Sequence, residues 1–575
     1  MGQTNNSPLF ASGRPSSSNS EERAAAEDDA LLGNQRKEVN TSSRRAGFWR
    51  EAGIFVWAVL ATAAVIVLAV LLTQHQNAPQ KSKKSGKRNL IFMVSDGMGP
   101  ASLSLTRSFR QLQEDLPFND ILHLDQHFIG SSRTRSSSSL VTDSAAGATA
   151  FSCGRKSYNG AISMLPDHTP CGTVLEAAKK AGYMTGLVVT TDITDATPAC
   201  FASHVDYRIE GDSIALQEVG EHPLGYRVVD LMLGGGRCHF LPNTTASSCR
   251  ADSRDVTKLA QEKYGWTYIN SRAGFDDLKY GKNVKLPLLG LFSDTDIPFE
   301  LDRRNMNDIY PSLDEMARTA LAALEAATKD SDKGFFLMIE GSRIDHAGHG
   351  NDPAAQVHEV LAYDRAFQSV VDFLDNSDIE GALVATSDHE TGGLAVARQL
   401  HASYPQYLWH PEVLANASHS AEYLSRALRA HIEKTNESGK KLRHFVESKL
   451  VEEGLGVVDA TDEEIELVIS NPALSAYAFA EIISRRAQIG WSTHGHSAVD
   501  VNIYGYAADS LRGNHENIEV GGFLRDYLNV DVDAITSKLN KTSRASSEVS
   551  LMAAGMEDQA LFGHYVERLQ KNLPQ

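Results

Sequence analysis

Four short apolar runs constrain the fold of this chain more than any other feature. Each is almost continuously apolar, ends in a carboxylate or a turn, and is followed by stretches with helical periodicity, such as 171–183 and 312–329. Such strands, alternating with helices, are typical of a parallel sheet covered on both faces. They predict one α/β body over residues 89–575, a doubly wound and mostly parallel sheet, with a helical insertion at about 421–486. The runs are NLIFMVSD (89–96), MTGLVVTTD (184–192), GFFLMIEG (334–341) and GALVATSDH (381–389).

Acidic and histidine residues gather where these runs end. The carboxyl ends of parallel strands meet at one edge of a sheet, where open α/β folds bind their ligands. A single acid at a strand end is usually structural, but four such ends together repel one another unless divalent cations neutralise them. The pattern therefore predicts metal ions at this edge. The residues placed there are Asp96, Asp195, Thr197, Glu340, Asp345, His346, His349, Asp388 and His389.

The residue types divide this group into three predicted metal sites. Two sets mix nitrogen and oxygen ligands and leave an open position, which suits catalytic zinc. The third offers only oxygens, which suit magnesium. Two zinc ions about 4 Å apart would clamp the entering and leaving oxygens of a phosphoryl displacement. The sets are Asp345 and His349 with a further histidine, then Asp96, Asp388 and His389, and finally Thr197 and Glu340 with Asp96 shared.

Ser144 has two readings. In the stretch TDSAAGATAFSCG (142–154), Asp143 and Ser144 alone indicate a helix cap. Beside a metal ion, the helix dipole and the cation both favour the serine alkoxide, and the same helix end binds phosphate oxygens. Arg208, which alone would be an ordinary surface arginine, can grip two phosphate oxygens at once. We predict Ser144 as a nucleophile and Arg208 as a phosphate ligand.

An uncharged stretch near the N-terminus, 52–73, is long enough to cross a bilayer as a helix. It lies too far along the chain to be a cleaved signal peptide. Residues 1–51 are rich in Ser, Asn, Ala and charge and are predicted to be disordered. Residues 74–88 are predicted to form a basic stalk. The prediction is a signal-anchor protein with a short tail on one side of a membrane and the large body on the other.

The orientation of this span rests on three weaker signals, because five basic residues flank it on each side. The body holds all five cysteines, whose spacing suggests the pairs Cys153–Cys171 and Cys238–Cys249 with Cys200 free. The tail carries EDDALL (27–32), which is similar to an acidic dileucine signal read by cytosolic sorting adaptors. These features predict a cytosolic tail and a lumenal body. The body also contains glycosylation sequons, at Asn243, Asn416, Asn436 and Asn540.

The charge balance argues against a nucleic-acid partner. The formal net charge is −18, and residues 1–88 carry 12 basic and 7 acidic residues, so residues 89–575 carry 43 basic against 66 acidic. A nucleic-acid binder needs a basic face. A negatively charged substrate would therefore need local compensation, from metal ions or a placed arginine.

Six ordered motifs together resemble the alkaline phosphatases, over the region from about residue 89 to the strand near 501–506. The span and the acidic dileucine tail make the chain similar to the fungal vacuolar, repressible, type II membrane-anchored branch of that family. The motifs are SDGMG (95–99), TDSAAGATAFSCG (142–154), DATPACFASH (195–204) with Arg208, EGSRIDHAGHG (340–350), TSDHETGG (386–393) and HGHSAVDV (494–501).

This resemblance implies a homodimeric α/β enzyme of the vacuole membrane. It would hydrolyse phosphate monoesters with two Zn²⁺ and one Mg²⁺ per subunit. Of His494 and His496, the family's spacing to a following acid fits His496, with Asp500 four residues later. Histidine at 346 agrees with animal members, where bacterial members typically have lysine. The implied roles are a phosphoserine on Ser144, one zinc on Asp345, His349 and His496, a second on Asp96, Asp388 and His389, magnesium on Asp96, Thr197 and Glu340 with Asp195 close by or in its water shell, and phosphate on Arg208.

Three other functions fit the sequence less well than phosphate monoester hydrolysis. A sulfatase needs Cys or Ser in a C/S-x-P-x-R context, which TDSAAGA lacks. Phosphodiesterases of the wider superfamily usually present threonine as nucleophile and lack a contact of the Arg208 type. A non-catalytic, membrane-anchored binding protein would have lost ligands, and every ligand position here is filled. The sequence favours the phosphomonoesterase and leaves its physiological substrate open.

Overall fold

The computed structural model of this chain describes residues 55–63 and 86–544. The chain divides into two units, Met1–Ser82 and Lys83–Gln575. In the first, residues 55–63 are helical. The predicted tail, most of the predicted span and most of the stalk lie outside the described residues. Within the described part, no single helix is long and apolar enough to cross a membrane, and one bent pair, Asp462–Ser470 with Pro472–Ala487, passes by length and composition only.

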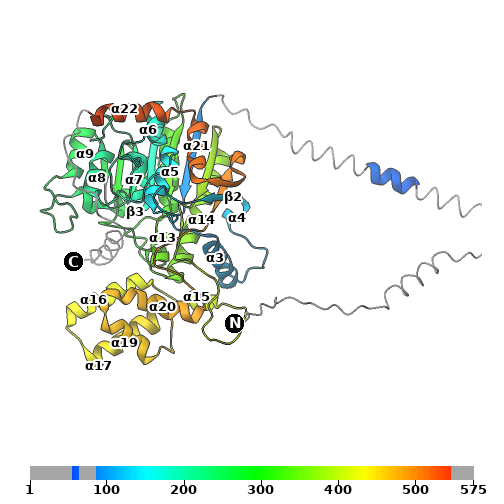
Figure 1. The fold of residues 1–575 in the computed structure, drawn as a ribbon, viewed down its shortest axis with the longest axis vertical. Coiled ribbons are helices and arrows are strands. Elements are labelled where there is room, and N and C mark those ends of the chain that lie inside the picture. The colour runs from blue at the N-terminus through cyan, green and yellow to red at the C-terminus, as the bar shows by residue number, and fades with distance from the viewer. Residues whose placement is uncertain (1–54, 64–85, 545–575) are drawn as a thin grey trace, which may run out of the picture. The chain divides into compact units, whose positions relative to one another are not determined.

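A ten-stranded sheet forms the centre of the second unit (Figure 1). The four apolar runs form four adjacent central strands, and every pairing in the sheet is parallel except those of β11 with β2 and β8. The predicted mostly parallel α/β sheet is confirmed. Its order is β12 (Gly513–Glu516), β2 (Phe128–Arg133), β11 (Val501–Tyr506), β8 (Glu380–Thr386), β1 (Arg88–Val94), β7 (Phe335–Glu340), β3 (Met184–Asp192), β4 (Leu231–Gly235), β6 (Leu288–Leu291) and β5 (Thr267–Ile269).

Two apolar layers cover the two faces of this sheet. In β1, Leu90 and Phe92 point into one layer and Ile91 and Met93 into the other, as the alternation of strand side chains requires. The first layer is closed by α5 (Ser144–Cys153), α6 (Val174–Lys180), α7 (Ala196–Ala202), α8 (Gly211–Val219), α9 (Val256–Tyr264), α21 (Asn517–Leu528) and α22 (Val532–Arg544). The second is closed by α3 (Pro100–Gln113), α4 (His123–Gln126), α10 (Arg272–Asp276), α12 (Leu313–Ala327), α13 (Arg343–His349) and α14 (Pro353–Asn376).

A separate group of helices, here the helical lobe (residues 411–487), packs on α3 and α14 (Figure 1). It includes the segment predicted as an insertion and has its own apolar core, with Leu424, Leu428, Phe479 and Ile483 buried. Its helices are α15 (Pro411–Ala415), α16 (Ala421–Thr435), α17 (Gly439–Phe445), η2 (Val446–Glu452), α18 (Glu453–Leu455), α19 (Asp462–Ser470), η3 (Pro472–Leu474) and α20 (Ser475–Ala487). The lobe lies between β9 (Glu390–Thr391) and β10 (His496–Ser497), which pair as a small antiparallel sheet.

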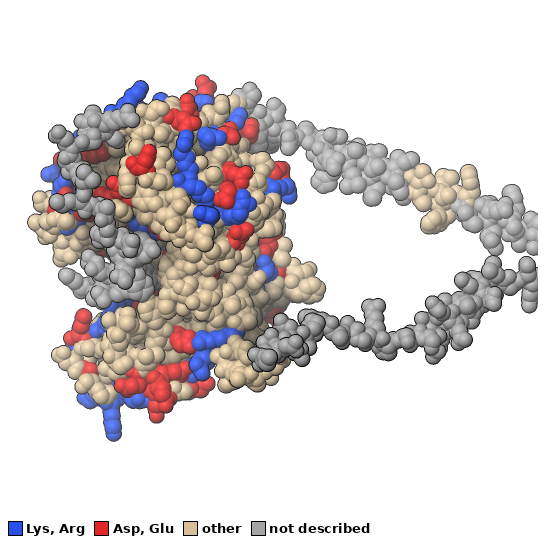
Figure 2. Space-filling model, in the orientation of Figure 1, with Lys and Arg blue, Asp and Glu red and all other residues tan. Residues whose placement is uncertain are grey.

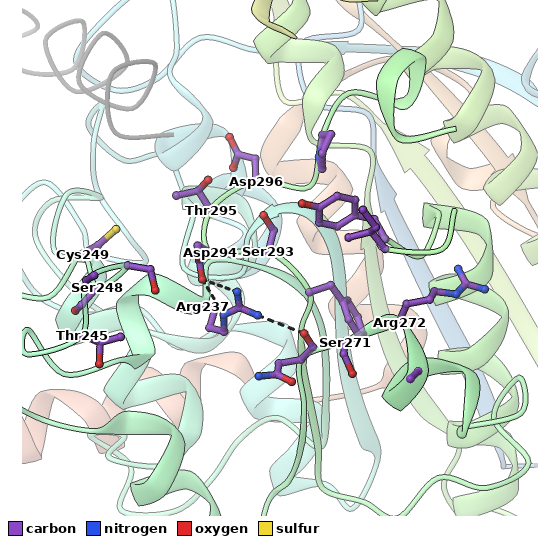
Figure 3. A pocket seen from close by; sticks show the side chains of 18 of the residues that line it. Arg237, Thr245, Ser248, Cys249, Ser271, Arg272, Ser293, Asp294, Thr295 and Asp296 are labelled. Atoms are coloured by element: carbon purple, nitrogen blue, oxygen red, sulfur yellow. Dashed lines mark hydrogen bonds and ion pairs between the residues drawn. The ribbon is translucent and has the colours of Figure 1, made fainter. Parts of the chain in front are cut away.

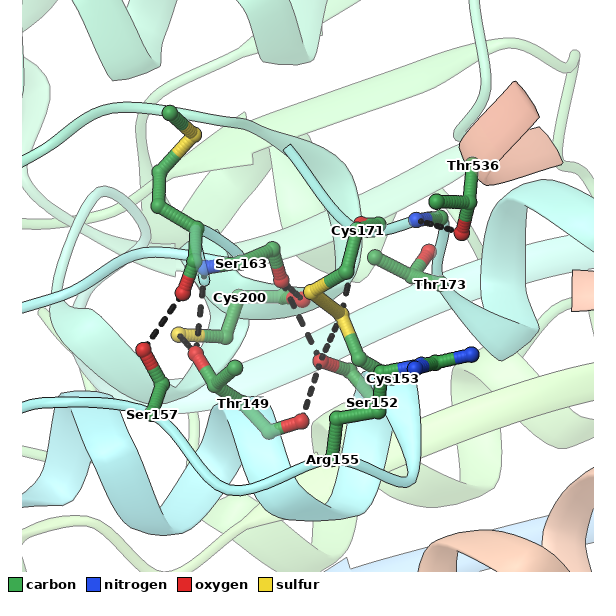
Figure 4. The surroundings of a disulfide bond; sticks show 12 residues. Thr149, Ser152, Cys153, Arg155, Ser157, Ser163, Cys171, Thr173, Cys200 and Thr536 are labelled. Carbon is green, nitrogen blue, oxygen red and sulfur yellow. Dashed lines mark hydrogen bonds between the residues drawn. A yellow bond between two sulfur atoms is a disulfide. The ribbon is translucent and has the colours of Figure 1, made fainter. Parts of the chain in front are cut away.

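Both predicted disulfides are present. Cys153, at the end of α5, is bonded to Cys171, just before α6, so the bond ties these two helices together (Figure 4). Cys238 is bonded to Cys249 and closes a short loop. Cys200 is free and buried, with its Sγ 3.3 Å from Thr149 Oγ1. Burial raises the pKa of the Cys200 thiol to about 12 and keeps it protonated.

Basic and acidic side chains are interspersed on the face of the second unit that Figure 2 shows. Among the described residues, this face has no extended area of only positive or only negative charge.

Candidate active site

The predicted site residues converge at the carboxyl ends of the central strands. Glu340 is the last residue of β7, and Asp96 and Asp388 each follow a strand by two residues. Gly97 makes the convergence possible, because a Cβ at this position would lie 2.5 Å from Asp345 Cα. Its φ of +76° is also one that side-chain-bearing residues rarely adopt. The turn after β1 thus brings the first motif, SDGMG, into contact with the fourth, EGSRIDHAGHG.

Asp96, Asp388 and His389 form one compact, buried group. His389 Nε2 lies 3.1 Å from Asp388 Oδ2 and 3.6 Å from Asp96 Oδ1. Burial, and then the charge of Asp388, raise the pKa of Asp96 well above its ordinary value. A buried carboxylate that neighbouring negative charge repels is a good cation ligand, because a bound cation removes the repulsion that opposes ionisation of the carboxyl group.

Asp345, His349 and His496 form a second group. Asp345 Oδ2 lies 3.3 Å from His349 Nε2, and Asp345 Oδ1 lies 3.6 Å from His496 Nε2. Each imidazole uses its Nδ1 on a backbone carbonyl: His349 faces the His494 oxygen, and His496 faces the Thr142 oxygen at 2.8 Å. A carbonyl only accepts, so each Nδ1 donates, and the two Nε2 atoms lie 3.2 Å apart beside Asp345. This is the usual arrangement of histidine ligands to metals.

The structure separates the two late histidines. The ring of His496 stacks on that of His389 with centroids 3.5 Å apart, which joins the two groups. His494 instead uses Nδ1 on the His349 carbonyl and packs against Tyr477. Its side chain does not belong to either group of possible metal ligands among the described residues.

Glu340 and Thr197 stand beside Asp96 and offer only oxygen atoms. Burial raises the pKa of Glu340 to about 8, with nearby Asp195 and Asp388 acting in the same direction. Asp195 caps α7 and accepts from Arg208 Nη2 at 3.0 Å.

Ser144 is the first residue of α5 and is buried. Its Oγ lies 3.0 Å from His389 Nε2. Asp143 caps the helix: one of its oxygens accepts from the Ala146 N–H, and the other lies 3.4 Å from Arg208 Nη1. Asp143 therefore holds both the start of α5, where Ser144 lies, and the guanidinium of Arg208. Backbone N–H groups at such a helix start favour anions.

The donor set fits divalent metal ions. Within the described residues, four buried oxygens in these groups lack a hydrogen-bond partner of ordinary geometry: Asp96 Oδ1, Asp388 Oδ2, Thr197 Oγ1 and Glu340 Oε2. Leaving buried polar atoms unpaired is unfavourable, so such atoms require an explanation. Cations held by these oxygens and by the converging imidazoles supply one.

Thr391 is a site residue that the motifs contained but that residue type did not single out. Its hydroxyl donates to Asp345 Oδ1 at 2.5 Å and lies 3.2 Å from His389 Nδ1. Since its proton goes to Asp345, it accepts from His389, which leaves His389 Nε2 without a proton and facing Ser144. A threonine two residues after His389 carries no such signal in sequence alone.

A cavity of about 1090 Å³ lies beside this edge, next to the ends of β4, β5 and β6 (Figure 3). Its arginines already have acidic partners: Arg237 pairs with Asp294 at 2.6 Å, and Arg272 pairs with Glu315 at 2.6 Å. The cavity therefore lacks the converging, unpartnered ligand atoms that mark the strand-end site.

Sequence comparisons identify the family. The family profile described as alkaline phosphatase matches residues 87–530. The chain belongs to the alkaline phosphatase family. The repressible alkaline phosphatase of Saccharomyces cerevisiae is 54% identical over 514 residues, covering 85% of this chain and 90% of that protein. An alkaline phosphatase of Schizosaccharomyces pombe is 49% identical over 483 residues, covering 83% and 88%.

Solved structures agree with this assignment. The crystal structure of Thermus thermophilus alkaline phosphatase matches with a TM-score of 0.64 at 28% identity, covering 82% of this chain and 98% of that one. As a member of the alkaline phosphatase family, this chain is a phosphomonoesterase, and its groups of possible metal ligands agree with the family's dependence on metals.

Proposed function

We propose that this chain hydrolyses phosphate monoesters by transferring the phosphoryl group to Ser144 and then to water. The observation that carries the proposal is the position of Ser144 Oγ, at a buried helix N-terminus and 3.0 Å from His389 Nε2. A hydroxyl in this position stands at a helix end whose dipole favours the oxyanion and beside a nitrogen that would bind zinc, so it would lose its proton readily.

The chain's own groups then account for both halves of the reaction. Arg208, held by Asp143 and Asp195, donates hydrogen bonds to two phosphate oxygens, and the N–H groups at the start of α5 donate to a third. Ser144 Oγ, after giving its proton to solvent, attacks phosphorus as the bond to the alcohol oxygen breaks in line, and the alcohol oxygen takes up a proton from solvent. Water then attacks the phosphoserine from the side vacated by the alcohol, which releases inorganic phosphate and restores Ser144.

The metal complement that we propose is two Zn²⁺ and one Mg²⁺ per subunit. When bound, these ions supply Lewis-acid stabilisation of the oxygens that gain negative charge. The residues that would hold them are Asp345, His349 and His496 for one zinc, Asp96, Asp388 and His389 for the other, and Asp96, Thr197 and Glu340, with Asp195 nearby, for magnesium.

Ser144→Ala tests the covalent step. We expect kcat on p-nitrophenyl phosphate to fall by about 10³-fold or more while zinc and magnesium content stay unchanged. Ser152→Ala is a matched control, since Ser152 is a buried serine on the same helix whose Oγ faces Ser163, 3.2 Å away. If the metal-loaded protein cleaved diesters but not monoesters, the assignment of the metal ligands would stand and the proposed monoester hydrolysis would be refuted.

We also propose a type II protein of the vacuole membrane, anchored by residues 52–73 and sorted through the signal at 27–32. The support is the apolar stretch and similarity over most of the chain to a yeast repressible alkaline phosphatase. Asn243, Asn416 and Asn436 are exposed and Asn540 is partly exposed, so glycans fit a lumenal body. Protease protection of the body in sealed vesicles, with loss of mass on glycosidase treatment, tests the topology. A homodimer, proposed from the family resemblance, is tested by light scattering of the detergent-purified protein.

A further inference from the structure

The helix that carries two of the proposed zinc ligands is short. α13 has seven residues, holds Asp345 and His349, and begins at Arg343. Its N-cap, Ser342, makes no side-chain capping bond. Helices of this length are not stable by themselves. The direction in which Asp345 and His349 point is therefore set by what α13 contacts.

Arg343 connects the start of this helix to the helical lobe. Its side chain is 2% exposed, and Nη2 donates to Glu422 Oε2 at 2.6 Å. Nη1 donates to the Ile297 carbonyl at 3.0 Å, and the guanidinium lies 3.7 Å from the centre of the Phe299 ring. Nε donates to His346 Nδ1 at 3.3 Å, on α13 itself, so this guanidinium links α13 directly to Glu422.

Glu422 is itself held firmly in place. It is the second residue of α16, whose N-terminus is docked into the body of the molecule. The Ser420 hydroxyl donates to Asp302 Oδ2 at 2.6 Å, and the Ala421 N–H donates to Asp352 Oδ2 at 2.7 Å. Asp352 also caps α14. One carboxylate thus joins the starts of two helices, and acids at helix starts are favourable.

The lobe also contacts the chain just beyond the other end of α13. Ser484 Oγ, on α20, donates to the Asn351 carbonyl at 3.1 Å, two residues after His349. Trp491 Nε1 donates to the same Ser484 oxygen at 3.0 Å, on the segment that leads to His496. Lobe contacts therefore lie on both sides of the pair Asp345 and His349.

We propose that Glu422 is a positioning residue for this catalytic centre, and that it acts through Arg343 on the orientation of α13. Glu422 touches neither substrate nor metal ligand. It holds the guanidinium of Arg343, the first residue of α13, in place. In this way it fixes the positions of Asp345 and His349 relative to His496. The helical lobe is then a part of the active-site framework. The proposal rests on the function proposed above, because it concerns the same metal-ligand group.

The test compares two isosteric changes in the detergent-purified full-length enzyme. Glu422→Gln removes the charge that holds Arg343. Glu481→Gln removes the partner of Arg398, another ion pair made by the lobe, at 2.7 Å. We expect Glu422→Gln to speed zinc release to a chromophoric chelator and to lower kcat, each about 10–100-fold, with little change in KM. Glu481→Gln is expected to match the wild type in both.

A double change separates positioning from stability. Arg343→Met with Glu422→Met removes both partners of the pair, so that neither of the two is left buried without the other, and such replacements often preserve stability. We expect it to recover the thermal unfolding temperature of the metal-free protein but to keep the fast zinc release. Recovery of zinc retention together with stability, or wild-type zinc release by Glu422→Gln, would overturn the proposal.

Ser144→Ala keeps this result distinct from the proposed function. Zinc release is measured without turnover. An active Ser144→Ala enzyme would refute the covalent mechanism, while the zinc-release comparison would still decide the role of Glu422.

Discussion

Two buried groups of acids and histidines in this molecule have similar composition but differ in their hydrogen bonds. One is the strand-end site, with Asp345, His349 and His496 at its open side. The other is a triad of Glu176, His204 and His222, in which Glu176 Oε1 lies 2.7 Å from His204 Nε2 and 2.9 Å from His222 Nε2. Both have the spacing of metal ligands.

The protons distinguish the two groups. In the triad, the Leu224 N–H donates to His222 Nδ1 at 3.1 Å, so the proton of that ring is on Nε2 and faces Glu176. His204 donates from Nδ1 to the Ser163 carbonyl at 3.1 Å, and Glu176 raises the pKa of this ring, which favours a second proton on the Nε2 that faces Glu176. The other oxygen of Glu176 accepts from the Thr173 N–H at 2.7 Å. In the strand-end site, by contrast, His496 Nδ1 donates to a carbonyl while burial lowers the pKa of the ring to about 3, so its Nε2 carries a lone pair. Proximity of acids and imidazoles is therefore not enough: a metal site also needs nitrogen lone pairs directed at the ligand group.

The largest expected effect comes from making the same amide substitution in each group. Asp345→Asn should lower kcat by about 10³-fold and lower the zinc content, because the ligand set loses its central carboxylate. Glu176→Gln should keep zinc content and kcat within about threefold of the wild type. Metal analysis and kinetics on both purified variants check this. Zinc lost on Glu176→Gln would mean that the triad, too, is a metal site.

Stability should show the reverse pattern. Glu176→Gln leaves buried His204 without its counter-charge and is expected to lower the free energy of unfolding by about 3–5 kcal/mol. Denaturant unfolding with excess chelator measures this without the metals. A loss below about 1 kcal/mol, the size typical of an exposed pair, would contradict the assignment of a buried ion pair.

The pH dependence of that difference sharpens the comparison. Burial would lower the pKa of His204, but Glu176 raises it above its ordinary value of 6.5, so the stabilisation is complete below that pH and is lost as pH rises through the folded pKa. Burial would raise the pKa of Glu176, but the histidines hold it below its ordinary value of 4.5, so the stabilisation is lost as pH falls through its folded pKa. The margin of wild type over Glu176→Gln should be largest at about pH 4.5–6.5 and smaller at pH 9.

The smallest expected effect is at Thr391, whose hydroxyl joins the two halves of the strand-end site. Thr391→Val keeps the shape but removes the bond to Asp345, and kcat should fall about 10-fold. Thr106→Val removes another buried hydroxyl, which donates to Ser102 O at 2.8 Å on α3, and should leave kcat unchanged. Equal effects of the two changes would show that Thr391 contributes packing alone.

Much of the sheet could be predicted because its central strands are buried on both faces. NLIFMVSD corresponds to β1 (Arg88–Val94), with the acid just beyond the strand end. The short β5, β9 and β10 were not predicted, since two or three residues carry no periodic signal. The antiparallel direction of β11 was also missed, because strand direction is set by pairing partners and not by local pattern.

The sequence by itself determined the α/β class and the residue types available as ligands, since these follow from local apolar pattern and side-chain chemistry, and cysteine spacing suggested the disulfide pairs. Only the tertiary structure decided which nitrogen of each histidine donates to the backbone, how Thr391 joins the two ligand groups, and that the lobe contacts α13. These properties depend on contacts between residues far apart in the chain, such as His496 with Thr142 and Glu422 with Arg343. Hydrogen bonds are directional and short, so their pairing is fixed only when the packed elements bring donor and acceptor together.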